Sequence, residues 1–454
     1  MNNNDKRLGA EPIPRLIFSL ALPAVAAQLI NVLYNIVDRI YIGHMEGAGD
    51  LALTGVGITL PILMVISAFS AFVGMGGAPL ASIRLGEGDH KGAERILGNS
   101  MTLLMIISVT LTVLFLAFKR PLLYLFGASG NLIGYADSYL TIYLIGTIFV
   151  QISLGLNTYI SAQGNAKTAM LSVLIGAIAN IILDPILIFW AGLGVSGAAL
   201  ATIFSQALSA VWVMRFLLSE KSVIRLRRQN MKLDRKIVGS IAALGVSPFL
   251  MQSTESLVNV VFNSGLQKYG GDLYVGSMTI MQSVMQLIVV PINGFGQGVQ
   301  PIISYNYGAR LEGRVRQTFR VLITITVSVA AAMCLLVVFF PAAFASIFTQ
   351  KQELIDLTAR MLPVFMAGIF AFGAQMGCQA TFLALGQSKI SLFLALLRKV
   401  ILLVPLALIL PRFFGVEGIY FSEPIADILS AATAVLLFAL NFNKILGKPP
   451  KAGK

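Results

Sequence analysis

Charged side chains are scarce in this sequence. Asp, Glu, Lys and Arg make up 12% of its 454 residues, whereas soluble domains average about 25%. Hydrophobic residues make up 57%, and the mean hydropathy is +0.83. So few charges exclude an ordinary soluble globule, and repeated apolar runs of about twenty residues or more indicate helices that span a membrane. The alternation of polar and apolar residues that marks a transmembrane β-barrel is absent.

Cysteine and histidine are nearly absent, with two residues of each type. Cys334 and Cys378 lie in apolar segments, so the sequence predicts no disulfide framework. Without clustered His and Cys, we expect no transition-metal site and no cofactor. Two GxGD patterns match intramembrane aspartyl proteases, but they lie in polar loops without the partner Tyr-Asp motif. Because paired carboxylates must share a site to do acid–base chemistry, we expect no enzyme.

The apolar segments predict an all-α membrane protein with twelve transmembrane helices. Their expected ranges are 14–38, 51–80, 96–118, 134–160, 168–190, 195–218, 237–263, 274–303, 317–341, 356–384, 390–411 and 418–441. Proline occurs within several of these ranges, where it removes a backbone hydrogen bond and permits a kink.

Lys and Arg outnumber Asp and Glu by 33 to 20, which gives a net charge of +13. With the N-terminus inside, 24 of the 33 basic residues fall on the inner side, 7 on the outer side and 2 within a span. This bias predicts a multi-pass protein of the cell (inner or plasma) membrane with both termini cytoplasmic. Because the basic residues are spread over loops, nucleic acid is not an expected partner.

The two halves of the chain repeat each other. Gly164-Asn165-Ala166-Lys167 returns as Gly386-Gln387-Ser388-Lys389 at an offset of 222, and Gly194-Val195 returns as Gly415-Val416 at 221. The repeat predicts two pseudo-symmetric, parallel six-helix lobes. We expect an N-lobe at 1–220, a basic cytoplasmic linker at 221–236 and a C-lobe at 237–454.

Polar residues interrupt the apolar helices of the first half. Gln28, Asn31, Asn35 and Asp38 share one face of the first helix. Asn180 and Asp184 lie one turn apart in the fifth helix. Asn157 lies in the fourth helix and Thr202 in the sixth. Carboxylates with amide and hydroxyl oxygens suit a proton relay or a hard cation such as Na+. Two alternatives stay open: Asp38 at the headgroup level, and Asn180 with Asp184 as a polar contact between helices.

The second half places its polar residues differently. Glu255 and Asn259 share a face of the seventh helix, and Gln282 and Gln286 share one in the eighth, beside Met285. These side chains predict an adaptable wall of a substrate cavity. Two basic residues of the eleventh helix, Arg398 and Lys399, are expected to form ion pairs with two acidic residues of the twelfth, Glu423 and Asp427. Unpaired charges in lipid would be costly.

The order of these motifs resembles the multidrug and toxic compound extrusion (MATE) family over essentially the whole chain, closest to its DinF-like and MepA-like branch. The residues that carry the resemblance are Pro23 through Asp38-Arg-Ile-Tyr-Ile-Gly43, Gln163-Gly-Asn165, Asn180-Ile-Ile-Leu-Asp184-Pro185 and Gln300-Pro-Ile-Ile-Ser-Tyr-Asn-Tyr-Gly308. The resemblance implies two V-arranged lobes of the MATE/MOP type. It also implies H+- or Na+-driven export of amphipathic, mostly cationic drugs by alternating access.

The resemblance further implies which residues do the work. Those for proton or cation coupling are Asp38, Asn180, Asp184, Thr202 and, more loosely, Asn157; the first four would also hold Na+ if Na+ is the coupling ion. The expected substrate-cavity residues are Gln28, Asn31, Tyr34, Asn35, Glu255, Asn259, Gln282, Met285 and Gln286. The partners expected are small organic cations and the lipid bilayer, with the protein a monomer. The alternative is a flippase for lipids or lipid-linked oligosaccharides of the same superfamily.

Overall fold

The computed structural model describes residues 3–45 and 49–448. Within these ranges the regular structure is helical throughout, with no strand. The helices are α1 (Asn3–Ala10), α2 (Ile13–Gly43), α3 (Gly49–Gly86), α4 (His90–Leu125), α5 (Ile133–Ile145), α6 (Thr147–Ala162), α7 (Ala166–Pro185), η1 (Ile186–Trp190), α8 (Gly194–Leu218), η2 (Arg228–Asn230), α9 (Arg235–Tyr269), α10 (Asp272–Gly308), α11 (Glu312–Phe339), α12 (Pro341–Ser346), α13 (Gln352–Phe365), α14 (Ile369–Ala384), α15 (Ser388–Leu396), η3 (Leu397–Leu403), α16 (Val404–Ile409), α17 (Pro411–Phe414) and α18 (Glu417–Leu446).

Ten of the described helical segments are long and apolar enough to cross a membrane. Two bent pairs, α5 with α6 and α13 with α14, raise the number to twelve if each pair is one span. All twelve predicted ranges coincide with these segments, so the predicted all-α membrane fold is confirmed. The observed helices are longer than predicted, because α3, α9 and α10 continue into polar residues beyond the apolar run.

The two sharp bends fall on glycines that correspond in the repeat. The first span bends by 58° between α5 and α6, where Gly146 lies, and the second by 50° between α13 and α14, next to Gly368. These glycines are 222 positions apart. A side chain at Gly146 would strike Ile203 of α8, and one at Gly368 would strike the backbone of Pro424 of α18. Close approach of a neighbouring helix therefore accompanies each bend.

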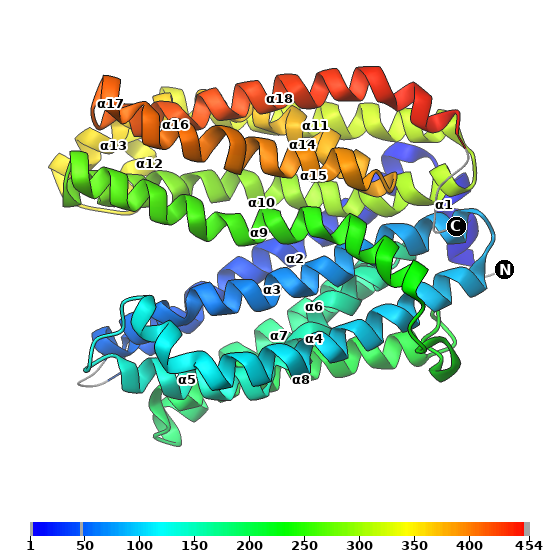
Figure 1. The fold of residues 1–454 in the computed structure, drawn as a ribbon, viewed down its shortest axis with the longest axis horizontal. Coiled ribbons are helices and arrows are strands. Elements are labelled where there is room, and N and C mark those ends of the chain that lie inside the picture. The colour runs from blue at the N-terminus through cyan, green and yellow to red at the C-terminus, as the bar shows by residue number, and fades with distance from the viewer. Residues whose placement is uncertain (1–2, 46–48, 449–454) are drawn as a thin grey trace.

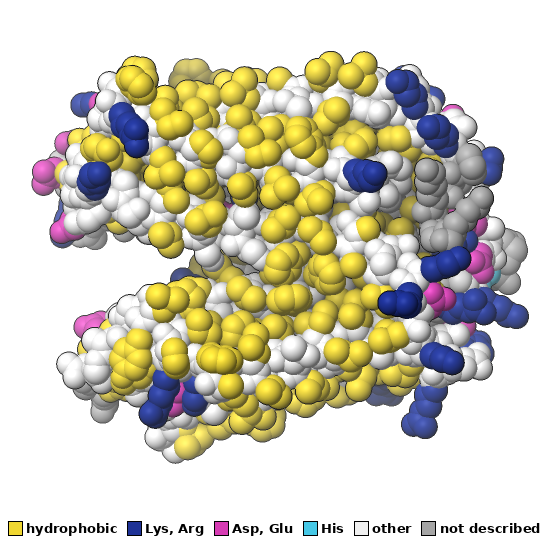
Figure 2. All heavy atoms as spheres, viewed as in Figure 1, with side chains coloured by type: hydrophobic (Ala, Val, Ile, Leu, Met, Phe, Trp, Pro, Cys, Tyr) yellow, Lys and Arg dark blue, Asp and Glu magenta, His cyan; other side chains and the backbone are white. Residues whose placement is uncertain are grey.

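The helices form two bundles with a cleft between them. Figure 1 shows α2–α8 below and α9–α18 above, splayed apart at the end away from both chain ends. In Figure 2 this cleft is open as a hollow on the left, while Lys and Arg side chains gather mainly at the opposite end. We call the bundle of α2–α8 the N-lobe and that of α9–α18 the C-lobe. The wide apolar surface on both lobes suits contact with lipid.

At the closed end the two lobes meet through reciprocal glycine contacts. A Cβ on Gly86 of α3 would lie 2.0 Å from the carbonyl oxygen of Tyr305 of α10, and one on Gly308 would lie 2.0 Å from that of Ile83. Both glycines and both carbonyls are related by the 222-residue offset. Only glycine lets the two backbones pack this closely, so the seam has the local symmetry of the repeat.

The segment between the lobes is fastened to the N-lobe. The Gln163 side-chain oxygen accepts hydrogen bonds from Ser222 Oγ at 3.0 Å and from the amides of Val223 at 2.7 Å and Ile224 at 3.1 Å. Farther along, Arg227 forms an ion pair with Glu94 of α4 at 3.1 Å. The segment therefore continues the packed structure of this end of the molecule.

Candidate functional site

A cavity of about 400 Å³ lies within the N-lobe and at its border with the C-lobe. Its walls come from α2, α3, α6, α7 and α8, with α10 and one residue of α9 on the far side. Hydroxyl, amide and small apolar side chains line it, and no charged side chain is among its described lining residues. An uncharged chamber of this volume, lined by both polar and apolar side chains, can hold a drug-sized molecule together with water.

Two carboxylates meet behind the wall of this cavity. Asn180 Nδ2 donates to Asp184 Oδ1 at 3.2 Å, and the carboxyl groups of Asp184 on α7 and Asp38 on α2 lie within hydrogen-bonding reach of each other. Asp184 is fully buried, and Asp38 is 9% exposed. Three oxygens of the cluster, Asp38 Oδ1, Asp184 Oδ2 and Asn180 Oδ1, accept no hydrogen bond from a donor of the described residues. Buried oxygens without partners offer a place for a proton or a small cation.

Thr202 of α8 is connected to the two acids by Tyr139, which interacts with both Thr202 and Asp38. Its hydroxyl donates to the Ala198 carbonyl at 3.0 Å, and Tyr139 of α5 contacts it by a side-chain hydrogen bond. The sequence-based prediction missed Tyr139. A signal was present, because Tyr139 and Tyr143 lie one turn apart in an apolar helix and stack with ring centroids 6.3 Å apart. The structure thus brings Asp38, Asp184, Asn180 and Thr202 to one region, which we call the acid site.

Asn157 lies in the cavity wall and is bonded to α7. Its Nδ2 donates to the Ala169 carbonyl at 3.1 Å, and its Oδ1 has no hydrogen-bond partner within residues 3–45 and 49–448. Its free oxygen makes it a polar contact for a ligand or water in the chamber, and its place in ion coupling stays a prediction. Ser205, another buried lining residue, has a hydroxyl without a hydrogen-bond partner in the described part of the chain and was not predicted.

The predicted substrate residues of α2 face this cavity, with one exception. Gln28, Asn31 and Tyr34 line it, and Gln28 Nε2 donates to Gln297 of α10 at 3.0 Å, which joins the two lobes. Asn35 is exposed instead, and its amide donates to the Asn31 carbonyl at 2.6 Å. The chamber therefore begins at a polar contact between the lobes.

The predicted substrate residues of the C-lobe lie elsewhere. Asn259, Gln282, Met285 and Gln286 are not among the residues that line the N-lobe cavity, and Met285 packs against an apolar cluster of the C-lobe. Glu255 forms an ion pair with Lys399. A role for these residues in substrate binding stays a prediction.

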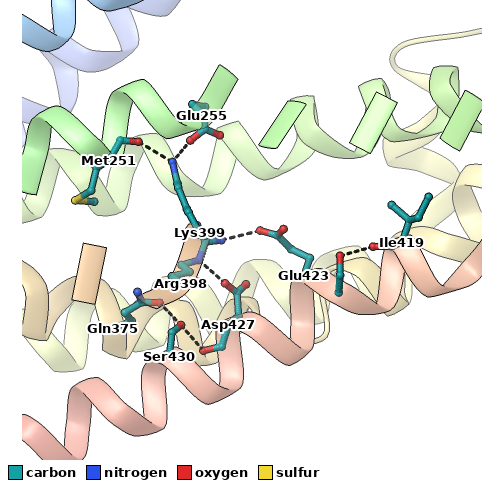
Figure 3. A network of polar contacts seen from close by, with 10 residues as sticks. Met251, Glu255, Gln375, Arg398, Lys399, Ile419, Glu423, Asp427 and Ser430 are labelled. Atoms are coloured by element: carbon teal, nitrogen blue, oxygen red, sulfur yellow. Dashed lines mark hydrogen bonds and ion pairs between the residues drawn. The ribbon is translucent and has the colours of Figure 1, made fainter. Parts of the chain in front are cut away.

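The charged residues of the last two spans pair as Figure 3 shows. Arg398 of η3 binds Asp427 and Glu423 of α18 at 2.6 Å and 2.7 Å, so its expected pairing is confirmed. The expected pairing of Lys399 with α18 is wrong. Its ammonium reaches α9 instead, because consecutive residues of a helix point about 100° apart.

No group of three or more His, Cys, Asp or Glu side chains suited to a metal ion occurs within residues 3–45 and 49–448. The acid site offers instead two carboxylates with amide and hydroxyl oxygens. Such oxygen donors suit a proton or a hard monovalent cation. Both cysteines are free.

Comparison with known proteins identifies the relatives of this chain. The MatE family model matches residues 23–186 and 248–409. The multidrug export protein MepA of Staphylococcus aureus is 26% identical over 430 residues, which is 94% of each chain. MepA of Staphylococcus haemolyticus is 26% identical over 424 residues, covering 93% of this chain and 92% of the relative.

The fold is also similar to that of a solved structure, a MOP superfamily transporter from Pyrococcus furiosus. The TM-score is 0.91 with 24% sequence identity, over 99% of this chain and all of the other. The shared fold therefore extends over both lobes, including the helices that carry the acid site.

Proposed function

The chain belongs to the MatE family and is a multi-pass membrane transporter rather than an enzyme, and we propose that it exports amphipathic, mostly cationic drugs by cation-coupled antiport. The named function of its MepA relatives, multidrug export, supports the export of small molecules. We further propose that it acts as a monomer with both termini in the cytoplasm. The cleft then opens to the outside, and the structure represents an outward-facing state.

The acid site is the single observation that carries the coupling mechanism. Asp38 and Asp184 are buried together next to the chamber. When both are ionised, they repel each other and attract a cation. An organic cation in the chamber, Na+ or a proton would relieve the same repulsion, so these ligands compete.

Competition of this kind produces exchange between the two sides of the membrane. A proton or Na+ that enters from the outside neutralises the acid site and weakens the hold on the drug. The neutralised site then favours return of the lobes to the inward-facing arrangement, where a new drug molecule displaces the ion. A ligand can shift this equilibrium only through different affinities for the two arrangements.

The alternative of a lipid flippase is not favoured. An anionic headgroup would need Lys or Arg around the cavity, and the described cavity lining has neither. The curated relatives reported above are named as multidrug export proteins.

A transport assay in proteoliposomes tests the proposal. Liposomes that contain the purified protein and a fluorescent organic cation receive a pH gradient or, separately, a Na+ gradient. We expect wild type to move the dye under at least one gradient, which identifies the coupling ion. Asp38→Asn should lose this response, because it removes a carboxylate of the acid site while keeping its shape.

Asp50→Asn is the matched control, since Asp50 is exposed at the start of α3. This variant should transport like wild type. Gradient-driven transport by Asp38→Asn equal to that of the control would refute the coupling role of the acid site. No movement by folded wild type under either gradient would refute the antiport itself.

A further inference from the structure

The C-lobe carries charged side chains at positions where the N-lobe has its cavity. Four residues of the cavity lining have charged counterparts at the repeat offsets of 222 and 221. The pairs are Gly176 and Arg398, Ala177 and Lys399, Thr202 and Glu423, and Gln206 and Asp427. Small or neutral residues around a chamber in one lobe are thus replaced by two cations and two acids in the other.

The contacts of the Arg398 guanidinium are with side chains inside the C-lobe. Its guanidinium binds Asp427 and Glu423, and the guanidinium carbon Cζ lies 4.6 Å from the ring centroid of Phe372. Asp427 is held further by Ser430, which donates to its carbonyl at 3.1 Å. Two acids and one fork of donors make a closed set, with little room for another ligand.

Lys399 has a different environment. Its Nζ donates to the carbonyl oxygen of Met251 at 2.7 Å and pairs with the carboxylate of Glu255, both on α9. Figure 3 shows the side chain extended from η3 to the underside of α9, away from the Arg398 cluster. The wide π-helical turn of η3, a feature often found at functional positions, lets neighbouring cations reach opposite helices.

The two partners of this ion pair differ sharply in exposure. The Lys399 side chain is 11% exposed, whereas that of Glu255 is 54% exposed. A lysine normally extends its ammonium toward water, but this one is buried against an acid that solvent can reach. Gln252, one turn before on α9, lines the N-lobe cavity, so the acid lies beside the space between the lobes.

We propose that Glu255 and the Met251 carbonyl form a primary-ammonium site in the C-lobe, and that Lys399 is its tethered ligand. A carboxylate next to a backbone carbonyl, whose oxygen has a second lone pair besides the one used within the helix, provides two acceptors for the N–H groups of one ammonium ion. The tether gives Lys399 a high effective concentration, so a free amine cannot compete. One consequence rests on the proposed function: because Lys399 occupies the C-lobe site, the exported cation can bind only in the N-lobe.

Chemical complementation tests the site directly. Lys399→Ala removes the side chain beyond Cβ, and n-propylammonium supplies the missing atoms. We expect the apparent melting temperature of purified Lys399→Ala to fall by a few degrees and to rise again, saturably, with n-propylammonium. A ligand that binds only the folded state stabilises it in this way. Wild type and Lys389→Ala, which changes an exposed lysine of α15, should show no saturable rise.

Three further variants or probes decide the location and the chemistry. Tetramethylammonium, which has no N–H donor, should not replace n-propylammonium. Lys399→Ala combined with Glu255→Gln should lose the response, and Lys399→Ala combined with Asp38→Asn should keep it. Absence of a response in folded Lys399→Ala, or loss of the response with Asp38→Asn, would overturn the proposal. Because melting requires no transport, failure of the antiport proposal would leave this result unaffected.

Discussion

Removal of the Arg398 charge should destabilise the C-lobe more than any single surface change. Its Nε lies 2.6 Å from Asp427 Oδ1, and a terminal nitrogen lies 2.7 Å from Glu423 Oε1. The three side chains are at most 10% exposed. Arg398→Met keeps an apolar chain of similar length but leaves two buried acids without their cation.

The size of the effect follows from this geometry. Breaking a buried ion pair by removing one partner costs about 3–5 kcal/mol, and here one cation serves two acids. We therefore expect a loss of about 3–5 kcal/mol in the free energy of unfolding. Arg398→Lys should cost less, about 1–3 kcal/mol, because it keeps the charge and loses the fork of donors that reaches both acids.

Unfolding of the purified protein by increasing SDS in mixed micelles measures this loss. Arg412→Met is the matched control, because Arg412 is exposed on α17 and should change stability little. The triple variant Arg398→Met, Glu423→Gln, Asp427→Asn should recover most of the loss, since no buried charge remains uncompensated. An Arg398→Met protein as stable as the Arg412→Met control would refute the reasoning.

Two other contacts give predictions of their own. Gly308→Ala places a Cβ 2.0 Å from the Ile83 carbonyl oxygen. Helices α3 and α10 must therefore move apart at the closed end. Distances between spin labels placed on the two lobes should shift toward values for a narrower cleft. Gly313→Ala is the control, because a Cβ at Gly313 meets nothing within 4 Å. A distance distribution equal to that of the control would contradict this prediction. Gln163→Leu leaves the hydroxyl and amide donors of residues 222–224 without their acceptor, at a cost of about 1–3 kcal/mol. Trypsin should then cut the segment between the lobes faster than in Gln163→Glu, which keeps an acceptor oxygen; equal rates would show that these bonds do not hold it.

The helices themselves could be predicted from the sequence. A span must satisfy all its backbone hydrogen bonds within lipid, which only a helix or a closed β-barrel can do. Because the sequence lacks the alternation of a barrel strand, each long apolar run must form a helix. The bends beside Gly146 and Gly368 could not be predicted in this way. Nothing in the local sequence distinguishes them from the other glycines of the chain, since the bend accompanies the approach of α8 or α18.

The candidate site shows the same division. The spacing of Asn180 and Asp184 predicted their shared face, and the hydrogen bond between them confirms it. Their approach to Asp38 joins two helices that are far apart in sequence, which spacing cannot determine. Tyr139 was missed for this reason: its spacing from Tyr143 is visible in the sequence, but its contact with Thr202 of α8 is not.

The sequence by itself determined the membrane class, the twelve helical segments and the repeat, because hydropathy and offset are properties of the chain alone. It also determined that Arg398 and Lys399 needed acidic partners, since isolated charges in a span are costly. The tertiary structure decided which partners they took. Adjacent residues of one helix point in different directions, and the packing of α9 and α18 on opposite sides of η3 assigns Lys399 to Glu255 and Arg398 to the two acids of α18.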